Sequence, residues 1–139
     1  MSTTEEQEVK IAEWRRDVDA AIAQDDPTVL RSEVIWVAMY HPDPVYAEAL
    51  CLQLSSHVNN EVRGNAVLGF GHVARVHGVL NRDLVQPIIL AALSETDRHV
   101  RGHAICAVQD TSHFLGWTFP QWDSETESFI PASAPQLAS

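Results

Sequence analysis

The chain has 139 residues, of which 45% are hydrophobic, and this suits one domain with its own apolar core. It carries 19 acidic residues against 9 basic ones, a formal net charge of −10 at pH 7. Proteins that bind nucleic acid need a basic surface to displace counterions, so this balance argues against nucleic acid as the main partner. It favours a basic protein partner, and the alternative is that the charge serves solubility alone, as in many acidic proteins.

Cysteine usage and the chain's beginning indicate a reducing environment. Cys51 and Cys106 lie in apolar helical runs and form no CxxC motif, so neither a disulfide framework nor a zinc site is indicated. The first ten residues are acidic and lack the basic and apolar regions of a signal peptide. No stretch of about 20 residues is apolar throughout, so we expect no membrane-spanning helix and no membrane partner. The expected location is cytoplasmic.

The first helix is predicted over residues 9–24, after an acidic segment, residues 1–8, that we expect to be disordered. Its apolar residues recur at spacings of three and four, which gives one dry face and one wet face. This stripe consists of Ile11, Trp14, Val18 and Ile22. Such a helix suits the end of a stack, where only the inner side has a neighbour.

Two further helices follow a strong start signal at Asp26, which can cap a helix whose first turn holds Pro27. The helix that continues to about Tyr40 is apolar almost all round, so we expect it in the interior. Two prolines within residues 41–44 then break it. A third helix is predicted over residues 44–56.

Three more helices are expected in the second half of the chain. The fourth covers residues 61–76 and stops at Gly78, since glycine is the usual C-terminal stop. The fifth lies within residues 82–93, where Pro87 marks either its start or a kink. The sixth begins after residue 97 and runs to about Phe114.

The tail, residues 117–139, has a different composition, with three prolines and no lysine or arginine. Five of the chain's ten aromatic residues lie here or just before it: Phe114, Trp117, Phe119, Trp122 and Phe129. We expect this segment to fold back and cap the last helix pair, because exposed apolar clusters are unusual. The alternative is an acidic-aromatic partner motif made of Trp122, Asp123, Glu125, Glu127 and Phe129.

A short phrase occurs twice: Val62-Arg63-Gly64-Asn65-Ala66 returns as Val100-Arg101-Gly102-His103-Ala104, with the arginines at 63 and 101 separated by 38 positions. Near-identical phrases at this distance are typical of stacked two-helix units. With the preceding Asn59 and Asp97, the phrase resembles the HEAT repeat, in the short bacterial form of proteins related to phycobilisome lyases.

The resemblance implies an all-α fold, an α-solenoid of about three HEAT-like helix pairs over residues 9–116 with an irregular aromatic-rich tail. Residues 26–29 look like a degenerate earlier copy, displaced by 33 from residues 59–62, with Leu30 where arginine is expected and Glu33 where alanine is expected. It also implies that Arg63 and Arg101 are structural and bridge to acceptors in the adjacent turn. The small glycine would permit close approach of the next repeat.

Aligning the two copies places a second set of side chains on one face of each helix. In the resembling family this face lines a concave surface, which would make a shallow binding groove. The candidate partner-binding residues are Trp36, Asn65, His72, Arg75, His103, Asp110, His113 and, in the tail, Trp122. The alternative is a solvated polar face, because every helix has a wet side.

Neither metal binding nor catalysis is expected. His99 and His103 have the spacing of two ligands on one helix, but no HExxH motif and no third ligand accompany them, so we expect no metal and no cofactor. His72 and Asp110 occupy the same slot in adjacent copies and could pair, which would raise the pKa of His72. No nucleophile accompanies the pair, so we expect no catalytic residues and no enzyme.

The predicted function is non-catalytic protein binding, with an acidic bacterial immunity or antitoxin-type inhibitor of a basic, toxin-like protein as the first hypothesis. The alternative is a small-ligand-binding or lyase-type enzyme like the phycobilin-handling members, which requires a deep pocket near Trp36, His72 and His103. A third possibility is a structural subunit with a large apolar patch.

Overall fold

The computed structural model describes residues 3–120, 122–123, 125–126 and 128–129. Within this part of the chain, six helices are followed by two strands of two residues each. The helices are α1 (Thr3–Gln24), α2 (Pro27–Tyr40), α3 (Pro44–Leu54), α4 (Asn60–His77), α5 (Arg82–Leu93) and α6 (Arg98–Leu115). The strands β1 (Trp122–Asp123) and β2 (Ser128–Phe129) pair in antiparallel fashion, with Trp122 opposite Phe129.

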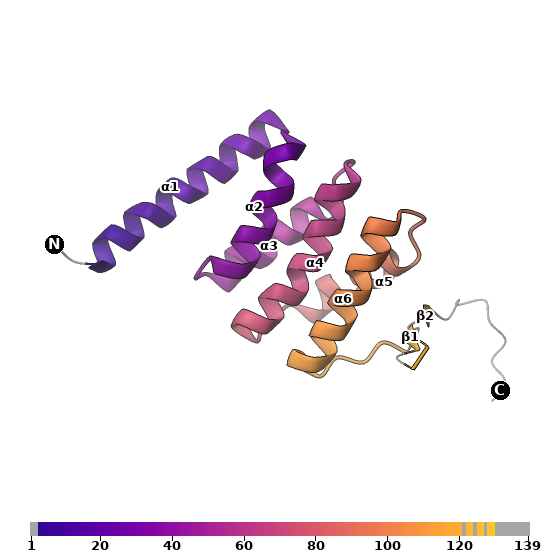
Figure 1. The fold of residues 1–139 in the computed structure, drawn as a ribbon. Helices are drawn as coiled ribbons and strands as arrows, with labels where there is room; N and C mark the ends of the chain where they lie inside the picture. The colour runs from indigo at the N-terminus through magenta and orange to yellow at the C-terminus, as the bar shows by residue number, and fades with distance from the viewer. Residues whose placement is uncertain (1–2, 121, 124, 127, 130–139) are drawn as a thin grey trace.

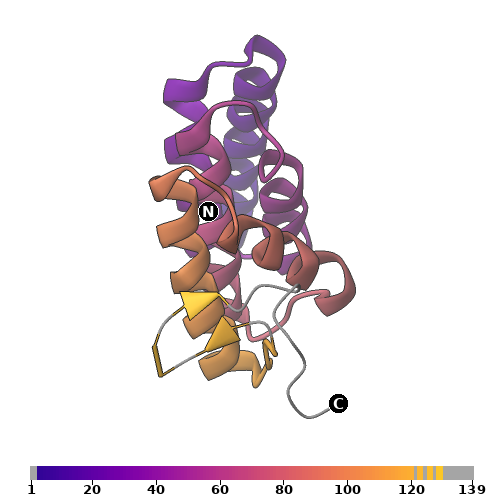
Figure 2. The same cartoon turned by 90° about the vertical axis from the view of Figure 1, so that its right-hand side faces the viewer.

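The helices are arranged in two layers (Figures 1 and 2). Helices α2, α4 and α6 lie side by side in that order, and α3 and α5 pack behind them. Helix α1 contacts the stack through α2 and diverges from it, so that its N-terminal half lies apart from the other helices (Figure 1). Of its residues only Val18 and Ala21 are buried.

Each helix after the first begins at a polar cap whose side chain accepts backbone N–H groups of the first turn. These caps are Asp26, Asp43, Asn59, Asn81 and Asp97. Helices α4 and α6 end at Gly78 and Gly116, whose φ angles of 67° and 69° lie in the left-handed region that glycine adopts without strain. The structure therefore confirms the helix start at Asp26 and the helix stop at Gly78 that were predicted from the sequence.

The repeated phrase belongs to a larger repeated unit. The caps Asp43 and Asn59 of the helix pair α3–α4 correspond to Asn81 and Asp97 of the helix pair α5–α6, always with an offset of 38. Helices α4 and α6 both have 18 residues and start and end at equivalent positions. One core, which includes Leu30, Phe70 and Ile89, runs between the layers.

Two element boundaries differ by two residues or more from those predicted, and one open alternative is decided. Helix α1 begins at Thr3, so the expectation of disorder is wrong for residues 3–8, because Glu5 and Glu6 stabilise the positive end of a helix when they lie in its first turn. Helix α3 ends at Leu54, two residues early, with Ser55 as its cap. Pro87 lies inside α5, so that helix does not begin there.

The described part of the tail returns to the last helix pair. Trp117 and Phe119 are buried in the common core, and Trp122 packs against it half-buried. Glu127 of the alternative acidic-aromatic motif and the last residues, 130–139, lie outside the described residues. None of the helices described here is both long enough and apolar enough to cross a membrane.

Candidate partner-binding surface

The two arginines of the repeated phrase bind the turn that precedes their own helix. Arg63 donates through Nη1 to the carbonyl oxygens of residues 57 and 58, at 3.0 and 3.3 Å. Arg101 repeats both contacts with the carbonyls of residues 95 and 96, at 2.9 and 3.2 Å. Arg63 in addition forms a two-pronged ion pair with Glu95 in the turn of the next pair, at 2.7 and 2.9 Å. Both arginines are therefore structural, as the resemblance implies.

Asn65 and His99 connect three neighbouring helices. The Asn65 amide nitrogen donates to the carbonyl oxygen of Arg31 on α2, at 2.8 Å. His99 on α6 has its Nε2 atom 3.0 Å from the Asn65 side-chain oxygen and 3.3 Å from the Glu61 carbonyl. Because both neighbours are acceptors, this nitrogen carries the proton. The ring of His103 lies 4.3 Å from that of His99, so Asn65 and His103 share one side of the stack.

His72 does not have the raised pKa expected from a pair with Asp110. Burial lowers the pKa of His72, the nearby Arg75 guanidinium lowers it further, and the opposite effect of Asp110 is smaller. The Arg75 Nη2 atom lies 3.3 Å from His72 Nδ1. Asp110 instead packs over Gly71, where a Cβ atom would stand 2.5 Å from its Oδ2 atom. Asp110 therefore acts on His72 as a nearby charge, and the burial that has the largest effect on the pKa of His72 is not visible in the sequence.

The pKa of His103 is lowered, as is that of His72. Burial is the main cause that lowers the pKa of His103, and the neighbouring His99 and His72 add to it. His72 and His103 are therefore neutral at pH 7. Among the described residues no group of three or more histidine, cysteine, aspartate or glutamate side chains is arranged to hold a metal ion.

The remaining candidate residues lie apart from this cluster. Trp36 stacks on Tyr40 at the other end of the stack, with ring centroids 5.3 Å apart. His113 is exposed on α6 and its ring contacts Phe114. Trp122 lines a hollow with Trp117 and other residues beside the C-terminal half of α6. The eight candidate residues are thus distributed over four places, the cluster on α4 and α6 and the separate surroundings of Trp36, His113 and Trp122.

A small-ligand site requires a deep pocket near Trp36, His72 and His103. Five hollows of the described surface are lined by residues of α1, of α1 with the end of α2, of the turn before α5, of the α3–α5 layer and of the tail. Their linings include neither Trp36, His72 nor His103, so none of these five hollows is the expected ligand site.

Helix α1 is held to the stack at its C-terminal half by an aromatic and charged cluster. Arg15 donates to Nε2 of the buried His41 and to the Asp43 carboxylate, both at 3.1 Å, and its guanidinium lies 4.3 Å from the centre of the Tyr46 ring. Trp14 donates to the Glu33 carboxylate at 2.7 Å. Burial, followed by the charge of Arg15, lowers the pKa of His41. These contacts hold the second half of α1 and leave the first half free.

Helix α1 carries acidic residues that the sequence analysis did not include among the candidate partner-binding residues. Helix α1 has six carboxylates: Glu5, Glu6, Glu8, Glu13, Asp17 and Asp19. Within the described part of the chain none of the six takes part in a hydrogen bond or an ion pair. In the rest of the described chain Glu33 of α2, Glu61 of α4 and Glu95 of the turn before α6 all have partners. The chain's surplus of negative charge is therefore most available on α1.

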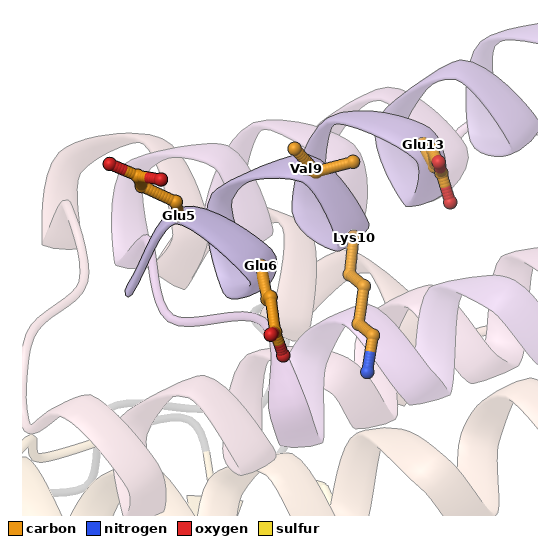
Figure 3. A pocket seen from close by; sticks show the side chains of 5 residues that line it. All are labelled: Glu5, Glu6, Val9, Lys10 and Glu13. Atoms are coloured by element: carbon orange, nitrogen blue, oxygen red, sulfur yellow. The ribbon is translucent and has the colours of Figure 1, made fainter. Parts of the chain in front are cut away.

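Figure 3 shows part of this acidic surface. Glu6, Lys10 and Glu13 extend to the same side of α1, and with Val9 and Glu5 they line an open furrow of about 500 Å³. Only residues of α1 line the furrow, so the furrow is a shallow depression of the surface and not an enclosed cavity. The spacing of Glu6, Lys10, Glu13 and Asp17, at intervals of four, three and four, is the signal that could have revealed the stripe.

Comparisons of the chain with protein-family models, with curated proteins and with solved structures find no match. The likeness to HEAT-like proteins therefore rests on the repeated phrase and the contacts made by its residues.

Proposed function

We propose that this protein is a non-catalytic, HEAT-like helical-repeat module that binds a basic protein partner, and that α1 supplies the charge for this recognition. The observation that carries the proposal is the set of six carboxylates on α1 that have no hydrogen-bond or ion-pair partner among the described residues. Carboxylates without internal partners attract an oppositely charged surface, which speeds association and orients the partner.

The face of α4 and α6 is less suited to a basic partner. It carries Arg75 and the imidazoles of His72 and His103, against the single carboxylate of Asp110. Asp110 moreover lies close to His72 and over Gly71. Electrostatic attraction to a basic protein is therefore strongest at the opposite end of the stack, where α1 and Trp36 lie.

Two observations support the HEAT-like part of the proposal. The helix pairs α3–α4 and α5–α6 have caps at equivalent positions, and the two arginines make equivalent carbonyl contacts. Helices α1 and α2 would then form the first pair of an α-solenoid, in which α1 is the terminal helix with one wet face.

The finer proposal is that the partner is a toxin-type protein and this chain its inhibitor, as in bacterial immunity or antitoxin proteins. A nuclease toxin needs a basic surface to hold its substrate, and an acidic helix can occupy that surface. Charge, size and architecture support this proposal. It predicts that the partner's nucleic-acid binding is lost when the complex forms.

The test is recovery of the partner from the source cells by cross-linking to the tagged chain, followed by titration of the purified pair at increasing salt concentration. We expect a basic partner whose affinity falls steeply with salt. Neutralising Glu6, Glu13 and Asp17 together, as Glu6→Gln, Glu13→Gln and Asp17→Asn, should weaken binding by about tenfold or more, since each charge contact contributes about 0.5–1 kcal/mol.

The matched control neutralises exposed carboxylates at the other end of the molecule, Asp83→Asn with Glu125→Gln, and should change the affinity less than about twofold. A partner that is acidic, or a binding constant that does not respond to salt, would contradict the proposed function.

A further inference from the structure

We propose that the groove between α1 and the C-terminal end of α2 receives an arginine-bearing helix of the partner, with Trp36 and Tyr40 as the platform for its guanidinium groups. This inference rests on the proposed function and names the side-chain chemistry and the place of the contact.

The first observation is an exposed aromatic stack. Trp36 and Tyr40 lie one turn apart on α2, their rings are 5.3 Å apart with planes 28° from parallel, and they are 53% and 59% exposed. Neither ring belongs to the common core. Large aromatic side chains left in solvent side by side are typical of interaction sites, because their burial by a partner contributes more than that of any other residue type.

The second observation is a groove directly beside the stack. Its volume is about 340 Å³, and its lining joins the first half of α1 to the end of α2: Gln7, Lys10, Ile11, Trp14, Tyr40 and Pro42. The floor is largely apolar, while Gln7 and Lys10 are polar. The groove lies where helices α1 and α2 diverge (Figure 1).

The third observation is the charge along the groove's α1 side. Lys10 is the charged residue of the groove's lining, and Glu6, Glu13 and Asp17 lie next to it on α1 at helical spacing, outside the lining. Figure 3 shows Glu6 and Glu13 on the same side of α1 as Lys10. The stripe holds three carboxylates and one ammonium group, so its net charge is negative. Lys10 is exposed on a flexible stem and can move aside when a cation enters.

Aromatic faces bordered by carboxylates select arginine over other side chains. The planar guanidinium group stacks on tryptophan and tyrosine rings and donates paired hydrogen bonds to a carboxylate at the same time. Lysine can make the charge contact but not the planar stack. Nucleic acid is repelled by the same carboxylates, so the occupant is a protein segment.

The dimensions of the surface favour a helical occupant. The stripe from Glu6 to Asp17 extends along α1 for about 16 Å, or three helical turns, at the rise of an α-helix. A partner helix laid in the opening between α1 and α2 would present residues at every third or fourth position to the groove, the usual mode of helix-in-groove recognition.

The experiment uses a capped helical peptide of repeated Arg-Ala-Ala-Leu units as the probe, with the Lys and Glu peptides of the same pattern as matched probes. Binding to the full chain is followed by NMR of the tryptophan indole N–H signals, which report on Trp36 separately from Trp14, Trp117 and Trp122. We expect the Arg peptide to shift the Trp36 signal, the Lys peptide to bind several-fold more weakly, and the Glu peptide not to bind.

Variants then test the platform. Trp36→Ala and Tyr40→Ala should each weaken binding of the Arg peptide by about fivefold, the size of a partly exposed cation–π contact. Phe114→Ala removes an exposed aromatic ring of α6, 42% exposed, and should leave the affinity unchanged. The replaced aromatic residues are exposed, so the variants are expected to fold, and thermal unfolding of each checks this.

The outcomes separate this inference from the proposed function. An Arg peptide that shifts Trp117 or Trp122 instead of Trp36, or that binds the Trp36→Ala chain equally well, overturns the groove as the site and leaves a basic partner in place. Absence of Arg peptide binding up to millimolar concentration also overturns the groove. Equal binding of the Glu peptide overturns the proposed function itself.

Discussion

The two copies of the repeated phrase begin with the same local structure and end in different surroundings. Arg63 and Arg101 bind equivalent carbonyls, and Gly78 and Gly116 end their helices with the same left-handed conformation. Yet a Cβ atom on Gly64 would stand 2.4 Å from the His99 ring, whereas one on the equivalent Gly102 would meet nothing within 4 Å. Gly64 is therefore required for the close packing of α4 against α6. Gly102 is not required for packing, and it lowers the stability of its helix because glycine is a poor helix former.

Residues 57 and 95 show how equivalent positions perform one task with different chemistry. His57 pairs with Asp25 at the end of α1, at 2.6 Å, and Glu95 pairs with Arg63 of α4. In both copies the position ties a helix pair to the helices before it. The ion pair therefore occurs at the same position of the repeat in both copies. The residue type at that position differs, because it matches a carboxylate in one copy and a guanidinium group in the other.

The largest difference in stability between the two copies is expected at the residue that follows Gly78 and Gly116, the glycines that end α4 and α6. Trp117 is 8% exposed and belongs to the core, whereas the equivalent Val79 is 54% exposed. Trp117→Ala should lower the free energy of unfolding by about 3–5 kcal/mol, as for other buried aromatic side chains. Val79→Ala should change it by less than about 0.5 kcal/mol. Urea denaturation measures both, and similar losses would show that the tail does not cap the second copy.

The next contrast concerns the two arginines. Arg63→Ala removes two carbonyl contacts and leaves the half-buried Glu95 without its partner, so we expect a loss of about 2–3 kcal/mol. Arg101 forms no ion pair with a described residue, and Arg101→Ala should cost about 1 kcal/mol. In a double-mutant cycle, Glu95→Gln should couple to Arg63→Ala but not to Arg101→Ala. Equal costs at 63 and 101 would remove the distinction.

A smaller effect on stability is expected at Gly64 and Gly102, with opposite signs in the two copies. Gly64→Ala crowds His99 and the Val100 backbone, and should destabilise the fold by about 1 kcal/mol after the gain in helix propensity is subtracted. Gly102→Ala meets open space and should stabilise the fold by about 0.5–1 kcal/mol. Thermal unfolding of the two variants should therefore shift in opposite directions, and a shared sign would contradict the packing at Gly64.

The smallest effect is a difference in acid sensitivity. His103 occupies the position of Asn65 in the second copy, and its pKa is lowered from the ordinary 6.5, chiefly by burial. The unfolded chain therefore binds more protons than the folded one as pH falls below 6.5, so stability decreases with acid. His103→Asn, which makes the second copy like the first, should reduce this decrease. Denaturation between pH 7.5 and pH 5 compares the slopes, and an unchanged slope would exclude His103 as a contributor.

The sequence by itself determines what depends on neighbours within a few residues. The caps at Asn59 and Asp97, the glycine stops and the contacts of Arg63 and Arg101 with their preceding turns are all local, so the repeated phrase predicts them. For the same reason, the ends predicted from the periodicity of apolar residues agree within two residues with the observed ends for five of the helices.

The tertiary structure decides what depends on residues far along the chain. The pKa of His72 is set by burial and by Arg75 more than by Asp110, which reverses the shift expected from the pairing alone. Glu5, Glu6 and Glu8 have no partner among the described residues because the first half of α1 diverges from the stack, and the sequence pattern does not contain that angle. Desolvation and long-range charge are properties of an assembled surface, so they arise only after the helices have packed.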